Sequence, residues 1–494
     1  MLHSNFFQND KKPLLLLGGL AFLLLFSNLW VLDLLEHSEA RYAEAAYEMT
    51  KNNNWLTPHI LGVEYFHKPP LIFWLVALSY KIFGFSEFSA RLPSALISMI
   101  SVYICYSLSK ALFDRKTAFY ACLILLLSPL FFAASHTLNF DIFLLFFSVA
   151  IIFYFYKITH QDKSFLNLII FYTLIGFSFL IKGPVIFIII TAPIVFLWKN
   201  RNLHNKQSLH FKIGLIVILG ISIPWYLFQY FNNHELLKYF LTQLTSRITS
   251  AQQNSYEISM HKAPFYYYIP IIFGGFFPWI LFLFSKKNKY LTKDKNIKLL
   301  FYWFIIPFIL FSLFTGKLIY YIVPTLIPLS IITARMIVFS KSFKIVCILG
   351  VICLPFFLTA PYSVKKLNPT FNIYKSAKSF QKVLKDYPNS EVLMIGKVLY
   401  AVPFYTQKEI AIFCEKGCLK KINFDSTRHS SDKLYLEDDY INKVIKKLQS
   451  RKNIFCIVHT SVFFTSLQPI AKKNNIELYI HKKTKDYILV SNFK

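Results

Sequence analysis

Long runs of apolar residues, separated by short polar segments, recur along the chain up to about residue 361. Most runs are roughly 20 residues long, which is the length that an α-helix needs to cross a bilayer. They are solidly apolar and do not alternate as transmembrane β-strands do. The pattern predicts a mainly α polytopic membrane protein with about 11–13 transmembrane helices. The spans that can be placed lie at about 13–34, 90–113, 117–135, 140–158, 165–181, 184–198, 211–231, 264–285, 298–315, 318–337 and 343–361.

The loops between these spans alternate in charge. Lys and Arg gather in every second loop, for example in 110–116 and 199–212, and short basic loops mark the cytoplasmic side of a membrane protein. The opposite loops, mainly 35–68 and 232–263, carry acids, histidines and aromatics and should lie on the non-cytoplasmic side. This alternation requires that segment 69–84, only about 15 residues long, does not cross the bilayer completely. We expect an interfacial or re-entrant helix there.

The chain changes character after residue 361. The apolar runs shorten to strand length, as in EVLMIG, EIAIF, NIFCIV, IELYI and YILVSN, and helix-like stretches at 436–450 and 460–473 lie between them. Short apolar runs alternating with helical patterns are typical of an α/β domain. The sequence therefore predicts a transmembrane domain over 1–361 and a small α/β domain on the far side of the membrane over 362–494.

Composition supports a membrane protein and excludes other classes. Of all residues 55% are hydrophobic and only 16% are charged, whereas a soluble domain carries about 25% charged residues. A soluble enzyme, a disordered chain and a fibrous protein are excluded. The net charge of +29 does not favour a nucleic-acid partner, because Lys and Arg cluster in short loops between apolar spans, as the positive-inside rule predicts. Cys414 and Cys418 are close enough in sequence to bridge in an oxidising compartment.

Unusual polar residues gather in the loops on the predicted non-cytoplasmic side. Several cations together with tyrosine hydroxyls can hold a phosphate or pyrophosphate at the membrane edge. A carboxylate can act there as a base, or stabilise positive charge that develops on a sugar carbon. Ionisable groups at membrane depth are costly and usually face a cavity or a partner. The candidates are Glu39, Arg41, Tyr65, His67, Lys68, Asp141, Lys182, Arg247, His261, Lys262, Lys317, Tyr320 and Tyr321.

Most of these candidates also have a simpler interpretation. Glu39 and Arg41 could be a pair on a solvated loop helix, Asp141 could be the N-cap of the following span, and Lys182 could be a lysine that reaches the membrane interface. The remaining candidates could be ordinary loop charges, a loop histidine, a residue at the start of a helix, or members of an aromatic belt. Their occurrence on one side of the membrane favours a shared site.

Six ordered motifs carry a resemblance to a known family. They are SEARYAEAAYEM, YFHKPPLIFW, LNFDIF, LIKGP, HKAPFYYYIPIIFGGFFPW and FTGKLIYYIVPTLIPLSI, and they fall within residues 13–340. In these stretches the chain resembles the bacterial branch of the protein mannosyltransferase / 4-amino-4-deoxy-L-arabinose lipid A transferase families, which are GT-C glycosyltransferases. After residue 361 the resemblance is one of architecture only.

The resemblance implies an inverting transfer of a sugar from undecaprenyl phosphate, at the periplasmic face of the bacterial inner membrane. It implies lipid A or a related envelope glycan as acceptor; a protein O-mannosyltransferase and a lipid-linked-sugar flippase are the alternatives. The catalytic acids would be Glu39 and Asp141. The donor phosphate would be bound by Arg41, Tyr65, Lys68, Arg247 and Tyr321, with Lys182, His261, Lys262, Lys317 and Tyr320 as further cavity residues.

Two positions depart from the family pattern. Ser38 stands where the aminoarabinose enzymes have an Asp, and His67 stands where they have a Glu that is linked to a metal site. If that Asp is the essential acid of the family, Glu39 is not its equivalent or the substrate differs. Because histidine also binds metals, His67 is the candidate ligand for a divalent metal ion. No other cofactor is implied.

Overall fold

The computed structural model divides the chain into two compact units. Unit 1 comprises residues 1–29, 68–72 and 91–362, and unit 2 comprises 30–67, 73–90 and 363–494. The residues whose structure is described are 7, 9–36, 38–66, 68–161, 164–200, 209–232, 263–284, 294–340, 342–371, 377–415, 434–436, 439–450 and 453–494.

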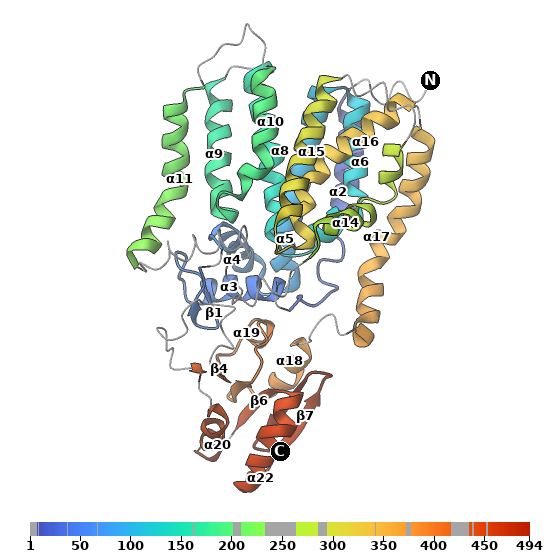
Figure 1. The fold of residues 1–494 in the computed structure, drawn as a ribbon. Helices are drawn as coiled ribbons and strands as arrows, with labels where there is room; N and C mark the ends of the chain where they lie inside the picture. The colour runs from blue at the N-terminus through green and yellow to red at the C-terminus, as the bar shows by residue number, and fades with distance from the viewer. Residues whose placement is uncertain are drawn as a thin grey trace. The chain divides into compact units, whose positions relative to one another are not determined.

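Unit 1 is a bundle of long apolar helices (Figure 1). Seven helical segments within the described ranges are long and apolar enough to cross a membrane, or eight if a helix pair bent by 66° counts as one span. The bent pair is α6 (Arg115–Leu126) with α7 (Pro129–Ser135). The other segments are α5 (Glu87–Leu112), α8 (Phe140–His160), α9 (Phe165–Lys182), α11 (Phe211–Asn232), α15 (Lys295–Leu313), η5 (Ile319–Thr325) continued by α16 (Leu326–Ser340), and α17 (Phe343–Phe371).

The remaining predicted spans are helical but shorter. α2 (Lys11–Phe26) has 16 residues and α10 (Val185–Lys199) has 15. The span predicted at 264–285 is broken into η2 (Phe265–Tyr267), α14 (Tyr268–Gly275) and η3 (Trp279–Phe284). Every predicted span thus coincides with a helix or a broken helix. Fewer than the predicted number reach full membrane length, because apolar runs continue through turns that end the helices.

Polar side chains fix where several of these helices begin. Asp114 accepts a hydrogen bond from the Thr117 amide at the start of α6, and Ser164 and Asp294 do the same for α9 and α15. Such caps satisfy amides that have no partner inside the helix. Within unit 1, α9 packs against α8 and α11 (Figure 1), so that the helix ends carrying polar residues are held in fixed positions.

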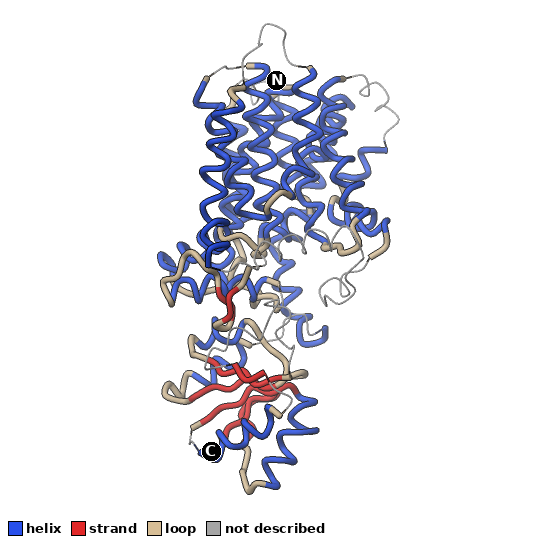
Figure 2. Tube along the Cα trace, turned by 60° about the vertical axis from the view of Figure 1, so that its left-hand side comes forward, coloured by secondary structure: helices blue, strands red, loops and turns tan. Residues whose placement is uncertain are grey.

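The tail of unit 2 contains a six-stranded sheet, drawn in red in Figure 2, with the order β5-β4-β3-β6-β8-β7. β3 (Glu391–Ile395) pairs in parallel with β4 and β6, and β8 pairs antiparallel with β6 and β7. This confirms the predicted α/β character of the tail. The other strands are β4 (Ile410–Cys414), β5 (Leu434–Leu436), β6 (Ile454–His459), β7 (Tyr479–Lys483) and β8 (Tyr487–Ser491).

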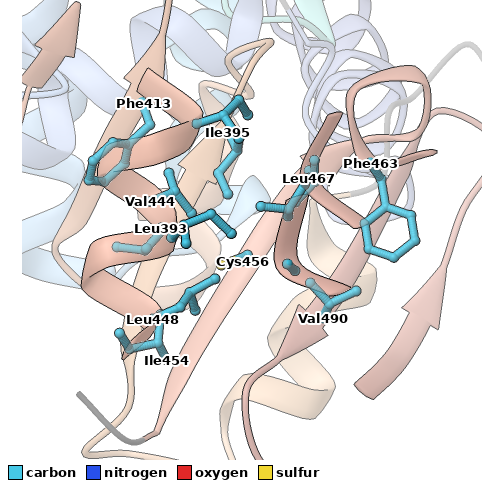
Figure 3. Packing of buried hydrophobic residues seen from close by; sticks show 14 of the residues in the cluster. Leu393, Ile395, Phe413, Val444, Leu448, Ile454, Cys456, Phe463, Leu467 and Val490 are labelled. Carbon is cyan, nitrogen blue, oxygen red and sulfur yellow. The ribbon is translucent and has the colours of Figure 1, made fainter. Parts of the chain in front are cut away.

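Apolar side chains from the sheet and its helices form the core of this tail. Figure 3 shows Val444 and Leu448 beside Leu393, all of them buried. Cys414 at the end of β4 is disulfide-bonded, whereas Cys418 lies outside the described residues. The helices of the tail are α18 (Lys378–Leu384), α19 (Ala401–Thr406), α20 (Tyr440–Ser450), α21 (Thr460–Val462), η6 (Phe463–Leu467) and α22 (Gln468–Lys473).

Unit 2 also contains the first long loop. This loop folds into α3 (Glu39–Lys51) and a hairpin of β1 (His59–Ile60) and β2 (Val63–Glu64), and is followed by α4 (Leu71–Phe83). α4 has 13 residues, in keeping with the expectation that segment 69–84 does not span the bilayer. α3 packs against α19, where the rings of Tyr47 and Phe404 lie 6.4 Å apart. The division into domains 1–361 and 362–494 stays a prediction.

Candidate active site

Asp141 lies in the first turn of α8 within unit 1. The N-cap of this helix is Asn139, whose Oδ1 accepts hydrogen bonds from the amides of Asp141 (3.1 Å) and Ile142 (3.0 Å). The Asp141 carboxylate is therefore available for another partner, and the interpretation of Asp141 as the N-cap is wrong. Lys182 Nζ donates to Asp141 Oδ1 at 2.5 Å. The two side chains are 8% and 7% exposed, so that they form a buried ion pair.

Lys182 is the last residue of α9, directly before Gly183, whose positive φ of 60° ends the helix. Its ammonium group also lies 4.5 Å from the centre of the Tyr321 ring, a cation–π distance. Because this lysine is enclosed by a carboxylate and an aromatic ring, the interpretation of Lys182 as a lysine that reaches the interface is wrong. A buried ion pair is costly to desolvate and is weak evidence for stability. At membrane depth it indicates a functional role.

The other candidates of unit 1 have separate environments. Lys68 Nζ lies 5.9 Å from the centre of the Phe140 ring, and Phe140 directly precedes Asp141. Lys317 donates to the carbonyls of Ala263 (2.8 Å) and Phe314 (2.5 Å), and its burial lowers its pKa. Tyr320 is half-buried in η5, next to the buried Tyr321. The structure thus brings Asp141, Lys182 and Tyr321 together, while Lys317 ties its own loop to the backbone.

The candidates of unit 2 lie on α3 and directly after the hairpin. Glu39 is 1% exposed, and its Oε2 accepts a hydrogen bond from the Leu35 amide at 3.0 Å. The interpretation of Glu39 as a residue of a solvated helix is therefore wrong. The Arg41 guanidinium lies 5.5 Å from the centre of the Tyr42 ring and 5.9 Å from that of Tyr65. Arg41 and the fully buried Tyr65 are thus neighbours, as a shared role at one ligand would require.

Four candidates lie outside the described residues: His67, Arg247, His261 and Lys262. Their roles stay predictions, as does the expectation that all candidates face one cavity. Across the described ranges no group of three or more His, Cys, Asp or Glu side chains is placed to hold a metal ion. The described side chains therefore do not form a metal-binding site.

Sequence reasoning missed two acids on α3. Glu44 is fully buried and Glu48 is half-buried. Burial, followed by the neighbouring Glu48, raises the pKa of Glu44 well above its ordinary value. Their four-residue spacing, interrupted by Ala45 and Ala46, could have indicated a pair on a buried helix face.

Comparisons with known proteins show what the chain is similar to. Residues 67–228 match the family model described as dolichyl-phosphate-mannose-protein mannosyltransferase. The chain is 33% identical over 316 residues to the undecaprenyl phosphate-alpha-4-amino-4-deoxy-L-arabinose arabinosyl transferase of Wigglesworthia glossinidia brevipalpis, covering 61% of this chain and 54% of the relative. It is 30% identical over 308 residues to arabinosyl transferase 2 of Proteus mirabilis strain HI4320, covering 60% and 54%. The matches thus span about half the length of these curated relatives.

A solved structure matches the fold over nearly the whole chain. The crystal structure of ArnT from Cupriavidus metallidurans bound to undecaprenyl phosphate superimposes with a TM-score of 0.77 at 19% identity, covering 97% of this chain and 98% of that one. The expectation of a GT-C membrane fold with a C-terminal sheet domain is confirmed. With its apolar helices this makes the chain a multi-pass membrane protein. The chain is thus similar in sequence to the mannosyltransferase family model over residues 67–228, and to aminoarabinose transferases over about 60% of its length.

Proposed function

We propose that this protein is an inverting glycosyltransferase that moves a sugar from undecaprenyl phosphate to lipid A or a related envelope glycan. The sugar that we favour is 4-amino-4-deoxy-L-arabinose, because the curated relatives are named for its transfer. The observation that carries the proposal is the buried group of Asp141, Lys182 and Tyr321. An ionised pair enclosed beside an aromatic ring is a preorganised polar environment of the kind that transfer of a charged group requires.

The transfer makes one bond and breaks one bond at the anomeric carbon of the sugar. An acceptor oxygen attacks this carbon from the face opposite the donor, and the bond to the undecaprenyl phosphate oxygen breaks. The leaving phosphate takes the bonding electrons. If the acceptor is a phosphate, it is already anionic at neutral pH, so that the reaction needs positioning and charge stabilisation rather than a strong base.

The cations and phenols are assigned to the donor phosphate. We assign Arg41 and Tyr65 to it because they lie side by side in unit 2, and an arginine fork matches a phosphate group. Lys68 and Tyr321 belong to the same assignment, as does Arg247, which lies outside the described residues. Glu39 and Asp141 are the acidic residues of the site. Asp141 is the better candidate for contact with positive charge on the sugar, because a hydrogen bond from the Leu35 amide holds Glu39.

The location of the reaction follows from the loop charges. The basic loops are assigned to the cytoplasm by the positive-inside rule, so that the candidate residues would face the periplasm from the inner membrane. The long tail of the undecaprenyl donor would lie among membrane lipids and apolar helices, with its phosphate at the membrane edge.

A protein acceptor is the second candidate, and the match to the mannosyltransferase family model favours it. A serine or threonine hydroxyl must lose a proton during the transfer, so that one of the acids would have to act as a base. Glu39→Gln would then abolish transfer, whereas near-normal turnover would count against a base role for Glu39.

The test uses the purified full chain and undecaprenyl phosphate that carries labelled 4-amino-4-deoxy-L-arabinose. Lipid A and unfolded periplasmic protein are offered as acceptors in separate reactions. Label in lipid A supports the proposal, and label only in protein supports the second candidate. A matched pair of variants controls the assay: Asp141→Asn should abolish transfer, and Glu477→Gln at an exposed position of the tail should not. Movement of the labelled lipid across vesicles without transfer would indicate a flippase and contradict both candidates.

A further inference from the structure

Two glutamates on α3 have no cationic partner among the residues that the structure describes. Glu44 is 0% exposed, and neither of its carboxyl oxygens has a hydrogen-bond partner among the described residues when it is treated as ionised. Glu48 Oε2 is in the same condition, while Glu48 Oε1 accepts a hydrogen bond from the Gly62 amide at 2.8 Å. A buried, unpaired carboxylate is costly. These oxygens therefore require a proton or a cation.

The charged groups around the pair do not supply that cation. Lys51 on the same helix lies with its ammonium 5.9 Å from the centre of the Tyr47 ring. The remaining groups that act on the pair or on the adjacent Tyr47 are the acids Glu36 and Glu409, and His59 on β1. In the described part of the chain neither glutamate has a cationic nitrogen within 4.0 Å. Acids thus outnumber cations around Glu44.

We propose that Glu44 and Glu48 share one proton at neutral pH. The shared proton keeps Glu48 in place to bind the Gly62 amide at the tip of the β1–β2 hairpin, which directly precedes Tyr65 in the sequence. Glu44 is the carboxylic acid and donates its O–H to Glu48 Oε2. Glu48 stays anionic and accepts from both Glu44 and the Gly62 amide. Both residues are positioning residues, because neither is assigned to contact a substrate.

The β1–β2 hairpin is too short to be stable without a contact at its tip. Leu61 and Gly62 connect β1 and β2, and both have positive φ values, 57° and 77°. The strands on either side have only two residues each, and a hairpin this short has little stability of its own. Its base is closed by the Tyr65 amide, which donates to the Pro58 carbonyl at 2.7 Å. Glu48 therefore fixes the tip of a hairpin whose last turn sets the position of Tyr65.

The pH response that follows has a definite sign. Burial first, and Glu48 second, raise the pKa of Glu44, and burial raises that of Glu48 against the opposing Gly62 hydrogen bond. The folded protein therefore keeps a proton that the unfolded chain has released above the ordinary carboxyl pKa. The free energy of unfolding is therefore highest below the ordinary carboxyl pKa. It falls as the pH rises toward and through the raised pKa of the folded protein, with a slope that corresponds to about one proton.

The proton is tested on the purified full chain by its thermal unfolding midpoint between pH 5 and pH 9. Glu44→Gln copies the protonated acid, so its midpoint should fall less with rising pH and exceed that of the wild type at the alkaline end. Glu477→Gln, the exposed control, should keep the wild-type slope. Infrared spectra supply a second measurement: a protonated carboxyl band at pH 7 should vanish in Glu44→Gln. A wild-type slope in Glu44→Gln, or no such band in the wild type, overturns the proposal.

The positioning role rests on the proposed function and has its own readout. Glu48→Ala should weaken binding of undecaprenyl phosphate about 10-fold, since the loss of a hydrogen bond to a charged group releases the hairpin. Glu48→Gln, which keeps an acceptor for Gly62, should recover most of the affinity. Equal affinity in Glu48→Ala and wild type contradicts the positioning role. If the wild type itself does not bind this lipid, the proposed function fails while the pH and infrared results still decide the shared proton.

Discussion

The ion pair of Asp141 and Lys182 in unit 1 and the acid pair of Glu44 and Glu48 in unit 2 solve one problem in two ways. In each case carboxylates are removed from water by the packing of helices. Asp141 is compensated by a lysine and an adjacent ring, and Glu44 is compensated by a proton shared with its neighbour. A buried acid therefore predicts a partner, but burial alone does not say which kind.

Mutations at the two sites should change stability differently. Removal of the cation from the ion pair leaves a buried charge without compensation, whereas an amide in place of the protonated acid leaves the buried charge unchanged. The acid pair should also lose its proton near neutrality or above it, because burial raises the pKa of both glutamates. Mutations at the two sites should thus have opposite consequences for stability.

The largest expected effect comes from Lys182→Met. The variant leaves Asp141 buried without its cation, and breaking a buried pair costs about 3–5 kcal/mol. A large fall in the thermal unfolding midpoint of the detergent-purified protein is the expected measurement. The double variant Lys182→Met/Asp141→Asn serves as control and should regain part of the loss, because no buried charge remains. Full stability in the single variant would mean that the pair is open to water.

The sequence predicts those features of the fold and the site that depend on neighbouring residues, and misses those that depend on contacts between distant segments. The spans, the α/β tail and the polarity of Asp141 and Lys182 are visible locally, because about 20 apolar residues interrupted by one charge stand out in any window. The pairing of these two residues is not visible, since 41 positions separate them. Asn139 and Asp141 are equally good N-caps by residue type, and only the backbone geometry chooses Asn139.

A second limit concerns residues that look ordinary. Glu44 and Glu48 read as charges on an amphipathic loop helix, and their burial depends on α19, which lies far along the chain and packs on α3. The tail also showed its strands clearly, but the sequence did not reveal that the first loop shares one compact unit with it. Contacts between distant segments decide both points.

Arg41→Lys tests the proposed donor-phosphate site on α3, the helix that also carries Glu44 and Glu48. The guanidinium lies beside the rings of Tyr42 and Tyr65, and a lysine cannot reproduce a planar fork at a stacked site. We expect undecaprenyl phosphate to bind about 10-fold more weakly, which is the effect of losing one charge-assisted hydrogen bond. The pH dependence of the unfolding midpoint should stay that of the wild type. Unchanged affinity would remove Arg41 from the phosphate site.

Asn139→Ala tests whether the cap supports the ion pair. Two amides at the start of α8 lose their acceptor, and loss of such a cap costs about 1 kcal/mol. We expect a small fall of the unfolding midpoint and a fall in transfer activity, because Asp141 lies in the turn that the cap holds. Asn139→Ser, which keeps an acceptor oxygen and adds no charge, is the matched control. Equal activity of the alanine variant and the wild type would show that Lys182 alone positions Asp141.

The smallest effect is expected at a third acid, Glu87 of unit 2, which is bound by both a lysine and a tyrosine hydroxyl. Lys378 Nζ forms an ion pair with Glu87 Oε1, and the Tyr405 hydroxyl donates to the same oxygen at 3.2 Å. The lysine side chain is 38% exposed, although that of Glu87 is only 10% exposed. Because solvent reaches the lysine and screens the pair in part, Lys378→Met should cost about 1 kcal/mol, well below the cost of Lys182→Met. The hydroxyl of Tyr405 also accepts from the Leu34 amide at 2.9 Å, so that Tyr405→Phe should lower the unfolding midpoint more than Lys378→Met does. A larger fall in the unfolding midpoint for Lys378→Met than for Tyr405→Phe would mean that solvent exposure does not weaken this ion pair. The contrast between the buried Lys182 at Asp141 and the partly exposed Lys378 at Glu87 would then be lost.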